Sequence, residues 1–538
     1  MGSSINAEIT NFTSVDKLVV EYSGNQYKVT NSNNNEVLFT STKTYADEIF
    51  SKALELVKEG GRIIVRPGEY LTEQTIILHS DVTLCGEDTT TVIKKITSGH
   101  VIAGNGVENV TLKKLKILSS VSNETAGNGI FFQNGSVNNI IDSCVVREVA
   151  GHGIMIKDPT SIHNVISNNI VADCDGNSGI GLMYKAGDAI ITGNKVYRTK
   201  THGIIISGGA SNCVVTNNYV ESSGYYRPAD STVDKYFCHG IAIDGGMLEN
   251  RGANHLIQGN TVINSGRAGI EVADWQDSVV IRDNYVHTTG LKCGDASDQY
   301  GIYFGGAIGN GIYGKIINNE IYNTKTEGIK IASKNTSIGR TADVLVDSNY
   351  VSNTSQDGIR VLCAKNIFIT NNEIENSAWN GITVEGPSGL IAQNIAITNN
   401  SVSGSLKYGI KLSYGDSITT INNRLCNNTL GEYSAGSGLG NTITVSDNEC
   451  VATPVKQIKR SPIKIIKTGV GCYQIKGVEN YKRLTIITSD LQGRKLNCQF
   501  YVSGESIMLT KPVNNRLYIV SVIDEGGKAI FQHKMCGI

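Results

Sequence analysis

Two short stretches, Gly153-Ile154-Met155-Ile156-Lys157 and Gly179-Ile180-Gly181-Leu182-Met183, are copies of one unit. A Gly-Ile pair opens such a stretch eleven times, at intervals of 23 to 37 residues. Within each copy the apolar residues have a period of two, which is typical of β-strands and differs from the period of a helical repeat. This internal repeat decides the fold. Its opening glycines are Gly129, Gly153, Gly179, Gly203, Gly240, Gly269, Gly301, Gly328, Gly358, Gly381 and Gly409.

A second ladder of residues accompanies the first. Stacked Asn side chains at a corner can hydrogen-bond along a ladder and tolerate left-handed backbone. One rung cannot bury its apolar face alone, so the rungs must stack around a continuous core. We therefore expect an all-β chain whose residues 61–455 form a right-handed parallel β-helix, a single-stranded solenoid of about a dozen rungs. The ladder consists of Asn169, Asn194, Asn218, Asn260, Asn284, Asn319, Asn349, Asn372, Asn400 and Asn423.

Residues 1–60 are expected to form N-terminal strands and a capping helix. Lys17–Tyr22 and Val37–Ser41 alternate polar and apolar residues, which indicates short strands. Apolar residues then follow helical spacing over Tyr45–Glu59, and Gly60-Gly61 is expected to end this helix. A short amphipathic helix here would cover the open end of the solenoid.

The repeat ends after about Thr453, and residues 456–538 are expected to form a small accessory β-sandwich. The run Asp490–Lys495, followed by Leu517–Val520, resembles the C-terminal sorting domains of secreted Bacteroidetes proteins. A generic accessory module is the alternative. The expected strands are Leu484–Thr488, Ser506–Leu509 and Leu517–Val522.

Composition sets limits on partners and location. The 538 residues carry a formal net charge of −1 and show no basic stripe, so a nucleic acid partner is not expected. No apolar run reaches the length of a membrane span, and no signal peptide is visible. Most of the twelve Cys are expected to be small buried residues, with disulfides or metal binding as the alternative. The oligomeric state stays open.

Strand alternation predicts which side chains leave the core. If the Ile after each Gly points inward, the second and fourth residues after the Gly point outward. On the middle rungs these outward positions become polar and ionisable. Parallel rungs stack roughly 4.8 Å apart, so this patch would span about 20 Å, enough for a few sugar units. It comprises Asp244, Glu271, Tyr303, Lys330 and Arg360, with His202, His239, Glu327 and Asp357 at the corner before the Gly.

Two long intervals place inserted loops beside this patch. Ser222–Cys238 contains Tyr225 and Tyr226, which are natural walls for sugar rings, and Leu291–Gln299 is the second loop. No His or Asp cluster has convincing metal-ligand spacing, and no cofactor is expected. Calcium is a minor alternative for the loop carboxylates. Those residues are Asp230, Asp234, Asp295 and Asp298.

A carboxylate pair is the first chemical hypothesis. Asp244 and Glu271 lie on neighbouring rungs with a two-residue shift, so their Cα atoms should be about 8 Å apart. Their carboxyl oxygens would then be roughly 5 to 9 Å apart, which admits a retaining or an inverting glycosidase, or simply two solvated acids. Asp274 is a substitute partner. The adjacent Trp275 is either a sugar-stacking platform or a packed corner residue.

A cationic pair is the second hypothesis. Lys330 and Arg360 lie one rung apart and could neutralise a uronate carboxylate, with Lys330 acting as the base of a β-elimination. Alternatively they pair with Glu327, Asp357 and Glu271. His202 and His239 should be neighbours in the corner stack, as turn residues or as acid-base groups.

The two ladders together resemble the pectate-lyase-like superfamily of right-handed parallel β-helices, over roughly residues 60–455. The resemblance implies a polysaccharide or oligosaccharide partner and an extracellular or cell-surface location, since members include polysaccharide lyases, glycoside hydrolases, uronate epimerases and adhesins. The sequence lacks the paired-Asp signature of polygalacturonases, the Arg-x-Pro-x-x-Arg segment of pectate lyases and the Asp-Pro-His of alginate epimerases. No catalytic residue is therefore carried over. A glycoside hydrolase is favoured, followed by a uronate lyase or epimerase and then a non-catalytic carbohydrate-binding protein.

Overall fold

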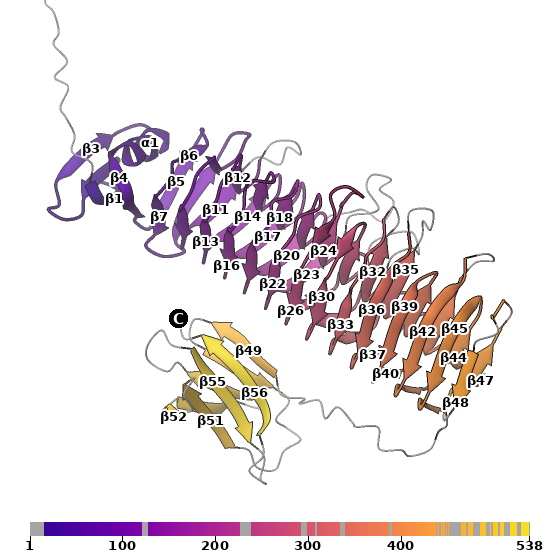
Figure 1. Cartoon of the computed structure of the whole chain (residues 1–538). Coiled ribbons are helices and arrows are strands. Elements are labelled where there is room, and N and C mark those ends of the chain that lie inside the picture. The colour runs from indigo at the N-terminus through magenta and orange to yellow at the C-terminus, as the bar shows by residue number, and fades with distance from the viewer. Residues whose placement is uncertain are drawn as a thin grey trace, which may run out of the picture. The chain divides into compact units, whose positions relative to one another are not determined.

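A computed structural model shows a long β-solenoid followed by a separate C-terminal unit (Figure 1). The contacts divide the chain into Met1–Val455 and Lys456–Ile538. In the second unit only the strand backbones are described. The structure describes residues 15–120, 127–225, 238–291, 299–306, 309–333, 339–386, 390–436, 438–440, 443–446, 448 and 450, together with the C-terminal strands between 464 and 536.

Three sheets line the solenoid, and this confirms the expected all-β fold. Their strands run parallel, apart from antiparallel N-terminal strands that extend sheet A. Sheet A has 18 strands, and it ends at β48 (Ile443–Ser446). Sheet B has 14 strands, from β5 (Gly68–Thr72) to β46 (Arg424–Cys426), and includes β40 (Glu373–Glu375). Sheet C also has 14 strands, so the solenoid has slightly more turns than expected.

The Gly-Ile pairs lie in sheet C, where each Ile begins or lies within a strand. Its strands, in order, are β6 (Ile76–Leu78), β9 (Ile102–Asn105), β12 (Ile130–Gln133), β15 (Ile154–Lys157), β18 (Ile180–Met183), β21 (Ile204–Ser207), β24 (Ile241–Asp244), β28 (Ile270–Ala273), β32 (Ile302–Gly306), β35 (Ile329–Ser333), β38 (Ile359–Leu362), β41 (Ile382–Glu385), β44 (Tyr408–Leu412) and β47 (Gly431–Ala435).

The repeated glycine is required by space. A Cβ added to Gly240 would lie 2.2 Å from Cγ1 of Val262 and 2.6 Å from the carbonyl oxygen of Gly269 on the next rung. The other glycines of this column, except Gly409 at its end, face the same two neighbours, a branched side chain and the next glycine's carbonyl. Any side chain here would therefore push the turn away from the core.

The Asn ladder forms as expected and is buried. The backbone N–H and Nδ2 of Asn284 both donate to Oδ1 of Asn319, at 3.1 and 2.9 Å, and Nδ2 also donates to the carbonyl of Ile257 at 3.0 Å. Each ladder Asn repeats this pattern, which satisfies the polar groups of the corner without water. The left-handed residue is not the ladder Asn but the residue before it, for example Asn318 with φ 53°.

The N-terminal cap is built around one helix. Helix α1 (Asp47–Leu56) packs its apolar side against β1 (Val15–Ser23), β2 (Gln26–Asn31), β3 (Val37–Ser41), β4 (Val57–Val65) and β6. The expected end of the helix was wrong, because Val57 is already extended and begins β4. Gly60-Gly61 therefore lies within that strand.

The C-terminal unit contains two four-stranded antiparallel sheets, the composition that a β-sandwich requires. The expected strands are present as β51 (Thr485–Asp490), β54 (Ser506–Thr510) and β55 (Leu517–Ile523). One sheet holds β49 (Lys464–Gly469), β50 (Cys472–Lys476), β53 (Gln499–Ser503) and β54 (Ser506–Thr510). The other holds β51 (Thr485–Asp490), β52 (Lys495–Leu496), β55 (Leu517–Ile523) and β56 (Ala529–Cys536).

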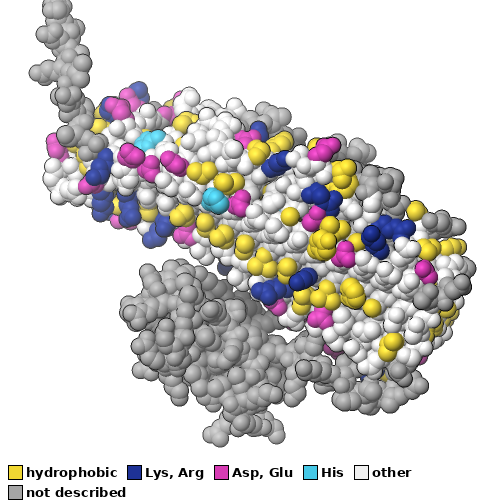
Figure 2. Space-filling view, viewed as in Figure 1, with side chains coloured by type: hydrophobic (Ala, Val, Ile, Leu, Met, Phe, Trp, Pro, Cys, Tyr) yellow, Lys and Arg dark blue, Asp and Glu magenta, His cyan; other side chains and the backbone are white. Residues whose placement is uncertain are grey.

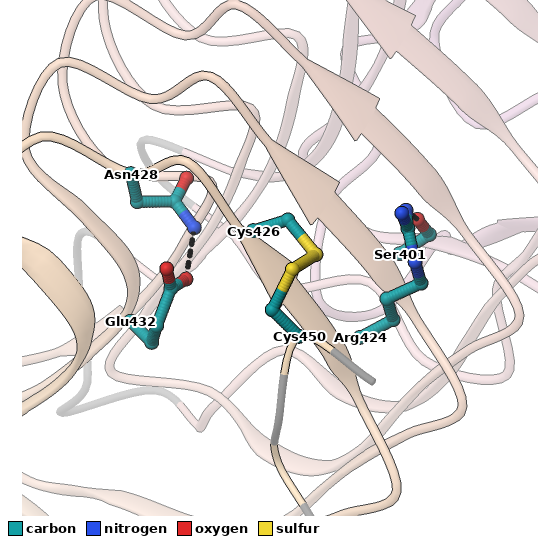
Figure 3. Close-up of a disulfide and its surroundings, with 6 residues drawn as sticks. All are labelled: Ser401, Arg424, Cys426, Asn428, Glu432 and Cys450. Atoms are coloured by element: carbon teal, nitrogen blue, oxygen red, sulfur yellow. Dashed lines mark hydrogen bonds between the residues drawn. A yellow bond between two sulfur atoms is a disulfide. The ribbon is translucent and has the colours of Figure 1, made fainter. Parts of the chain in front are cut away.

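Most described cysteines are buried thiols, as expected, but one disulfide is present. Cys426, on the last strand of sheet B, is bonded to Cys450 (Figure 3). Next to it, Nδ2 of Asn428 donates to Glu432 at 2.6 Å. The disulfide links the last strand of sheet B to the segment that follows the solenoid. The other cysteines whose side chains are described are all buried except the half-buried Cys85; they are Cys85, Cys144, Cys174, Cys213, Cys238 and Cys363.

Candidate active site on sheet C

The outward column of sheet C has the expected register. Glu271 pairs with Tyr303, Tyr303 with Lys330, and Lys330 with Arg360 on successive rungs. The column is far less exposed than strand alternation predicts, since Tyr303 is 3% and Lys330 9% exposed. Part of the reason is that the corner side chains lie against it, with the Tyr300 ring stacked on Tyr303 at 5.2 Å between centroids.

An apolar cluster divides the expected polar patch into two halves. It consists of Tyr300, Tyr303 and small residues of neighbouring rungs, with Leu362 packed against it. The carboxylates of β24 and β28 lie on one side of it along the column, and the ion pairs of β35 and β38 lie on the other. The single 20 Å polar patch of the sequence analysis is therefore two separate sites.

The first half is a group of interacting carboxyls. Asp244 ends β24, Glu271 lies on β28, and Asp274 follows β28. Burial, together with the negative charges of Glu271 and Asp274, raises the pKa of Asp244 to about 8. Asp244 is therefore a neutral acid at pH 7, while its neighbours act on it as anions.

His239 binds Glu271 directly. Nε2 of His239 lies 2.6 Å from Oε2 of Glu271, and the two side chains are 1% and 15% exposed. The backbone N–H of Ala268 donates to Nδ1 of His239 at 3.2 Å. Because Nδ1 accepts, the ring hydrogen is on Nε2 and is donated to the carboxylate. Glu271 is thus held as an oriented, partly exposed carboxylate.

The same corner bond recurs along the solenoid. Nδ1 of His202 accepts the backbone N–H of His239 at 3.3 Å, and Asp357 accepts that of Asn380 at 3.0 Å. The rings of His202 and His239 stack at 5.3 Å, as expected for corner neighbours. A corner side chain therefore caps the next rung. Burial raises the pKa of Asp357, and hydrogen bonds from Asn380 and Thr383 offset only part of this effect. The observed role of Asp357 is to cap the next rung.

Asp274 and Trp275 have structural contacts that the sequence did not predict. Oδ1 of Asp274 accepts the backbone N–H of Gly309 at 3.0 Å. Trp275 is only 4% exposed, and the guanidinium of Arg251 lies 4.9 Å from its ring centroid. A Cβ on Gly309 would lie 2.6 Å from the Trp275 ring, so that backbone also covers it. Trp275 is a packed corner residue and offers no open ring face to a sugar.

The second half is an ion-pair cluster. Glu327 lies 3.4 Å from Nζ of Lys330 and 2.7 Å from Nη1 of Arg360, and Arg360 also pairs with Glu385. Nζ of Lys330 donates to the Tyr300 hydroxyl at 3.0 Å. Burial acts to raise the pKa of Glu327, but Lys330 and Arg360 outweigh it and the pKa is lowered.

In this geometry the two cations have the alternative role, as partners of carboxylates. Glu327 contacts both Lys330 and Arg360 and offsets the repulsion between them. The pKa of Arg360 is raised because Glu385 and Glu327 outweigh its burial. Both residues are engaged cations. Pairing with Glu327 is confirmed, whereas Glu385, not Glu271, is the second carboxylate bonded to Arg360.

Some expected site residues lie outside the described part. These are Tyr226 and the four loop carboxylates Asp230, Asp234, Asp295 and Asp298, whereas Tyr225 is described and exposed. Among the described residues, no group of three or more His, Cys, Asp or Glu could hold a metal. On the face shown in Figure 2, described acidic and basic side chains are interspersed, without a continuous basic stripe. No described helix is long and apolar enough to cross a membrane.

Two neighbours of the expected site residues, Glu385 and Tyr300, were not singled out from the sequence. Glu385 is in the fourth position after its Gly, one rung beyond Arg360 in the second position. Asp244 and Glu271 are also a diagonal pair, with the fourth position on the earlier rung and the second on the later one. The same rule applied to Arg360 would have pointed to Glu385. Tyr300 precedes Gly301 and so lies at the corner, and its contact with Lys330 depends on a side-chain direction that alternation does not give.

Comparison with known proteins gives one family match. The model of the right-handed beta helix region matches residues 100–286 and 300–481. No curated protein matches.

Three solved structures with a similar fold are available for comparison. The A-module of an Azotobacter vinelandii mannuronan C-5 epimerase is 16% identical, covers 74% of this chain and 93% of its own, and has a TM-score of 0.36. An exopolygalacturonase from Thermotoga maritima is 14% identical, with coverage of 72% and 88% and a TM-score of 0.41. A GH87 alpha-1,3-glucanase from Streptomyces thermodiastaticus is 14% identical, with coverage of 75% and 68% and a TM-score of 0.39.

Proposed function

Because this chain belongs to the family of right-handed β-helix proteins, we propose that it is a carbohydrate-active enzyme, a glycoside hydrolase that uses Asp244 and Glu271. One observation carries the proposal: two adjacent carboxyls have environments that separate their protonation states. Burial and neighbouring anions raise the pKa of Asp244 to about 8, whereas Glu271 accepts a hydrogen bond from His239. Glycosidases need this combination of one neutral acid and one carboxylate.

The two residues would divide the reaction as follows. Asp244, protonated at neutral pH, gives its proton to the oxygen of the leaving sugar as the glycosidic bond breaks. Glu271 either attacks the anomeric carbon directly or takes a proton from the water molecule that attacks this carbon. His239 donates to Oε2 of Glu271 and so fixes which carboxylate oxygen is presented to substrate. This chemistry needs no cofactor.

Accessibility also supports this pair over the other candidates. Glu271 and Asp244 are both partly exposed, whereas Glu327, Asp357 and Tyr303 are buried in ion pairs, caps or the apolar cluster. A polymeric substrate would suit an extracellular or cell-surface location, which stays a prediction. The stereochemical course would be read from the anomer formed first, by proton NMR of the products.

The test is a screen of neutral and uronic polysaccharides that reads reducing ends and ultraviolet absorbance together. We expect reducing ends without absorbance, and a loss of at least about a hundredfold in Asp244→Asn and in Glu271→Gln. Glu375→Gln is the matched control, since Glu375 lies on sheet B and bonds Tyr350 at 2.7 Å. Growing absorbance would mean elimination and would refute the proposal. Binding without turnover on every substrate would refute it in favour of a carbohydrate-binding protein.

A further inference from the structure

The charges on the outer side of sheet C are strongly unequal. We count the charged side chains on six rungs, those of β24, β28, β32, β35, β38 and β41. On each rung the count begins at the corner residue before the Gly and ends at the strand's last residue or the one after it. These positions carry two cationic side chains, Lys330 and Arg360, against six carboxyls. Even with Asp244 neutral, five carboxyls remain. The six are Asp244, Glu271, Asp274, Glu327, Asp357 and Glu385.

Both cations already have carboxylate partners. Glu327 lies within 3.4 Å of Lys330 and 2.7 Å of Arg360, and Glu385 bonds the second terminal nitrogen of Arg360. These contacts engage both terminal nitrogens of Arg360, the pair that could otherwise hold a carboxylate ligand, while its Nε–H is buried without a hydrogen-bond partner. A uronate at this place would have to displace Glu327 or Glu385 and leave that carboxylate unpaired, and burial makes an unpaired charge costly.

The other half of the face has no described cation among its strand and corner residues. Asp244, Glu271 and Asp274 are brought together at adjacent rungs, and a sugar bound there would contact carboxyl oxygens and the Nε2–H already committed to Glu271. Such groups accept hydrogen bonds from sugar hydroxyls, whereas a sugar carboxylate would meet like charge in a partly desolvated place.

We propose that this face selects an uncharged glycan and discriminates against polymers of uronic acids. The inference rests on the proposed function, because it takes the outer side of sheet C as the substrate site. It names the substrate class of that site: a neutral hexose or pentose polymer whose hydroxyls donate to Asp244, Glu271 and the carboxylates around Arg360.

The experiment compares matched pairs of polymers on the full chain. Polygalacturonate and alginate are each tested beside their carboxyl-reduced forms, which keep the backbone and lose the charge, and a glycan array extends the set. We expect the reduced form to bind at least about tenfold more tightly in each pair that binds, and array hits to be uncharged. The difference should shrink between 0.05 and 0.5 M salt, because salt screens the repulsion.

A single substitution should reverse part of this preference. Glu385→Gln keeps the size of the side chain and releases one end of Arg360, so binding of the uronic member should improve at least about fivefold relative to the reduced member. Glu375→Gln removes the same charge from sheet B, one strand earlier in the chain, and should leave the preference unchanged.

The outcomes separate this inference from the proposed function. Preferential binding of the uronic forms, or no glycan bound on the array, would overturn the inference. Hydrolysis of a uronic polymer with reducing ends and no unsaturated product would overturn the inference while keeping the hydrolase. Cleavage of a neutral polymer by the wild type that survives in both Asp244→Asn and Glu271→Gln would overturn the proposed catalytic pair while keeping the inference.

Discussion

Replacing Asp244 with Asn should change how the stability of this protein depends on pH, and no substrate is needed to see it. The pKa of Asp244 is about 8 in the folded chain, against about 3.9 for an unfolded Asp. Between these values the folded state keeps a proton that the unfolded state has released. The free energy of unfolding of the wild type therefore falls as the pH rises through this window, and the loss is complete above about pH 8.

The size of the effect follows from the same two values. A separation of about four pKa units corresponds to roughly 5.5 kcal/mol, at about 1.4 kcal/mol per unit. Asp244 is half-buried, and solvent at its exposed edge reduces the penalty on its charge. We therefore expect the free energy of unfolding of the wild type to drop by about 2 to 4 kcal/mol, relative to Asp244→Asn, between pH 5 and pH 9.

Urea unfolding at pH 5, 7 and 9 measures this difference. Subtracting the Asp244→Asn curve removes the titration of the other groups, and Asp347→Asn serves as a control on sheet A. Infrared spectra at pH 7 should also lose the carbonyl band of a protonated carboxyl in Asp244→Asn alone. Parallel pH profiles of the wild type and Asp244→Asn would show that Asp244 is already ionised at pH 5, and the assignment of the acid would fail.

Four other changes test the site and the scaffold. The kcat/KM on a hydrolysed substrate should fall about tenfold per pH unit above about pH 8, because Asp244 must carry its proton; a constant value up to pH 10 would contradict this role. Asn319→Ala removes two donated and two accepted side-chain hydrogen bonds and should cost about 3 kcal/mol by urea unfolding, and a cost below about 1 kcal/mol would show that the ladder is not needed there. Gly240→Ala should cost at least about 2 kcal/mol because its Cβ would meet Val262, and Val262→Ala in the same chain should restore part of the loss. Cys450→Ser should lower stability by about 3 kcal/mol because the disulfide closes a loop with a sequence separation of 24, and unfolding under reducing conditions should abolish the difference from the wild type.

The fold and the rung register could be predicted because they follow from local rules. A Gly whose Cβ position is filled by a neighbour, as at Gly240, recurs on successive rungs from β12 to β44, so the period is written directly in the sequence. Once the Gly aligns the rungs, alternation places Glu271, Tyr303, Lys330 and Arg360 in one column whatever the length of the loops between them. Insertions of different length leave the column intact.

The burial of that column and its partners could not be predicted in the same way. Alternation gives the side of the sheet but not the direction of a long side chain at the corner. Tyr300 stacks on Tyr303 and accepts a hydrogen bond from Lys330, which turns an expected open face into a packed one. The ion pair between Arg360 and Glu385 runs diagonally between rungs, and only the rotamers decide whether such a pair forms.

The corner of the solenoid links the scaffold to the proposed chemistry. A side chain at this position accepts the next rung's backbone N–H whether it is Asp357 or His239, so the bond exists for packing. In a His, however, that bond uses Nδ1 and forces the hydrogen onto Nε2. His239 therefore presents an N–H group at the outer face, and Glu271 on the next rung accepts a hydrogen bond from it. Stacking the rungs thus already orients every residue that this arrangement needs. His239 is a neutral donor beside the Glu271 carboxylate, and Asp244 is kept protonated by its burial and by the charges of Glu271 and Asp274.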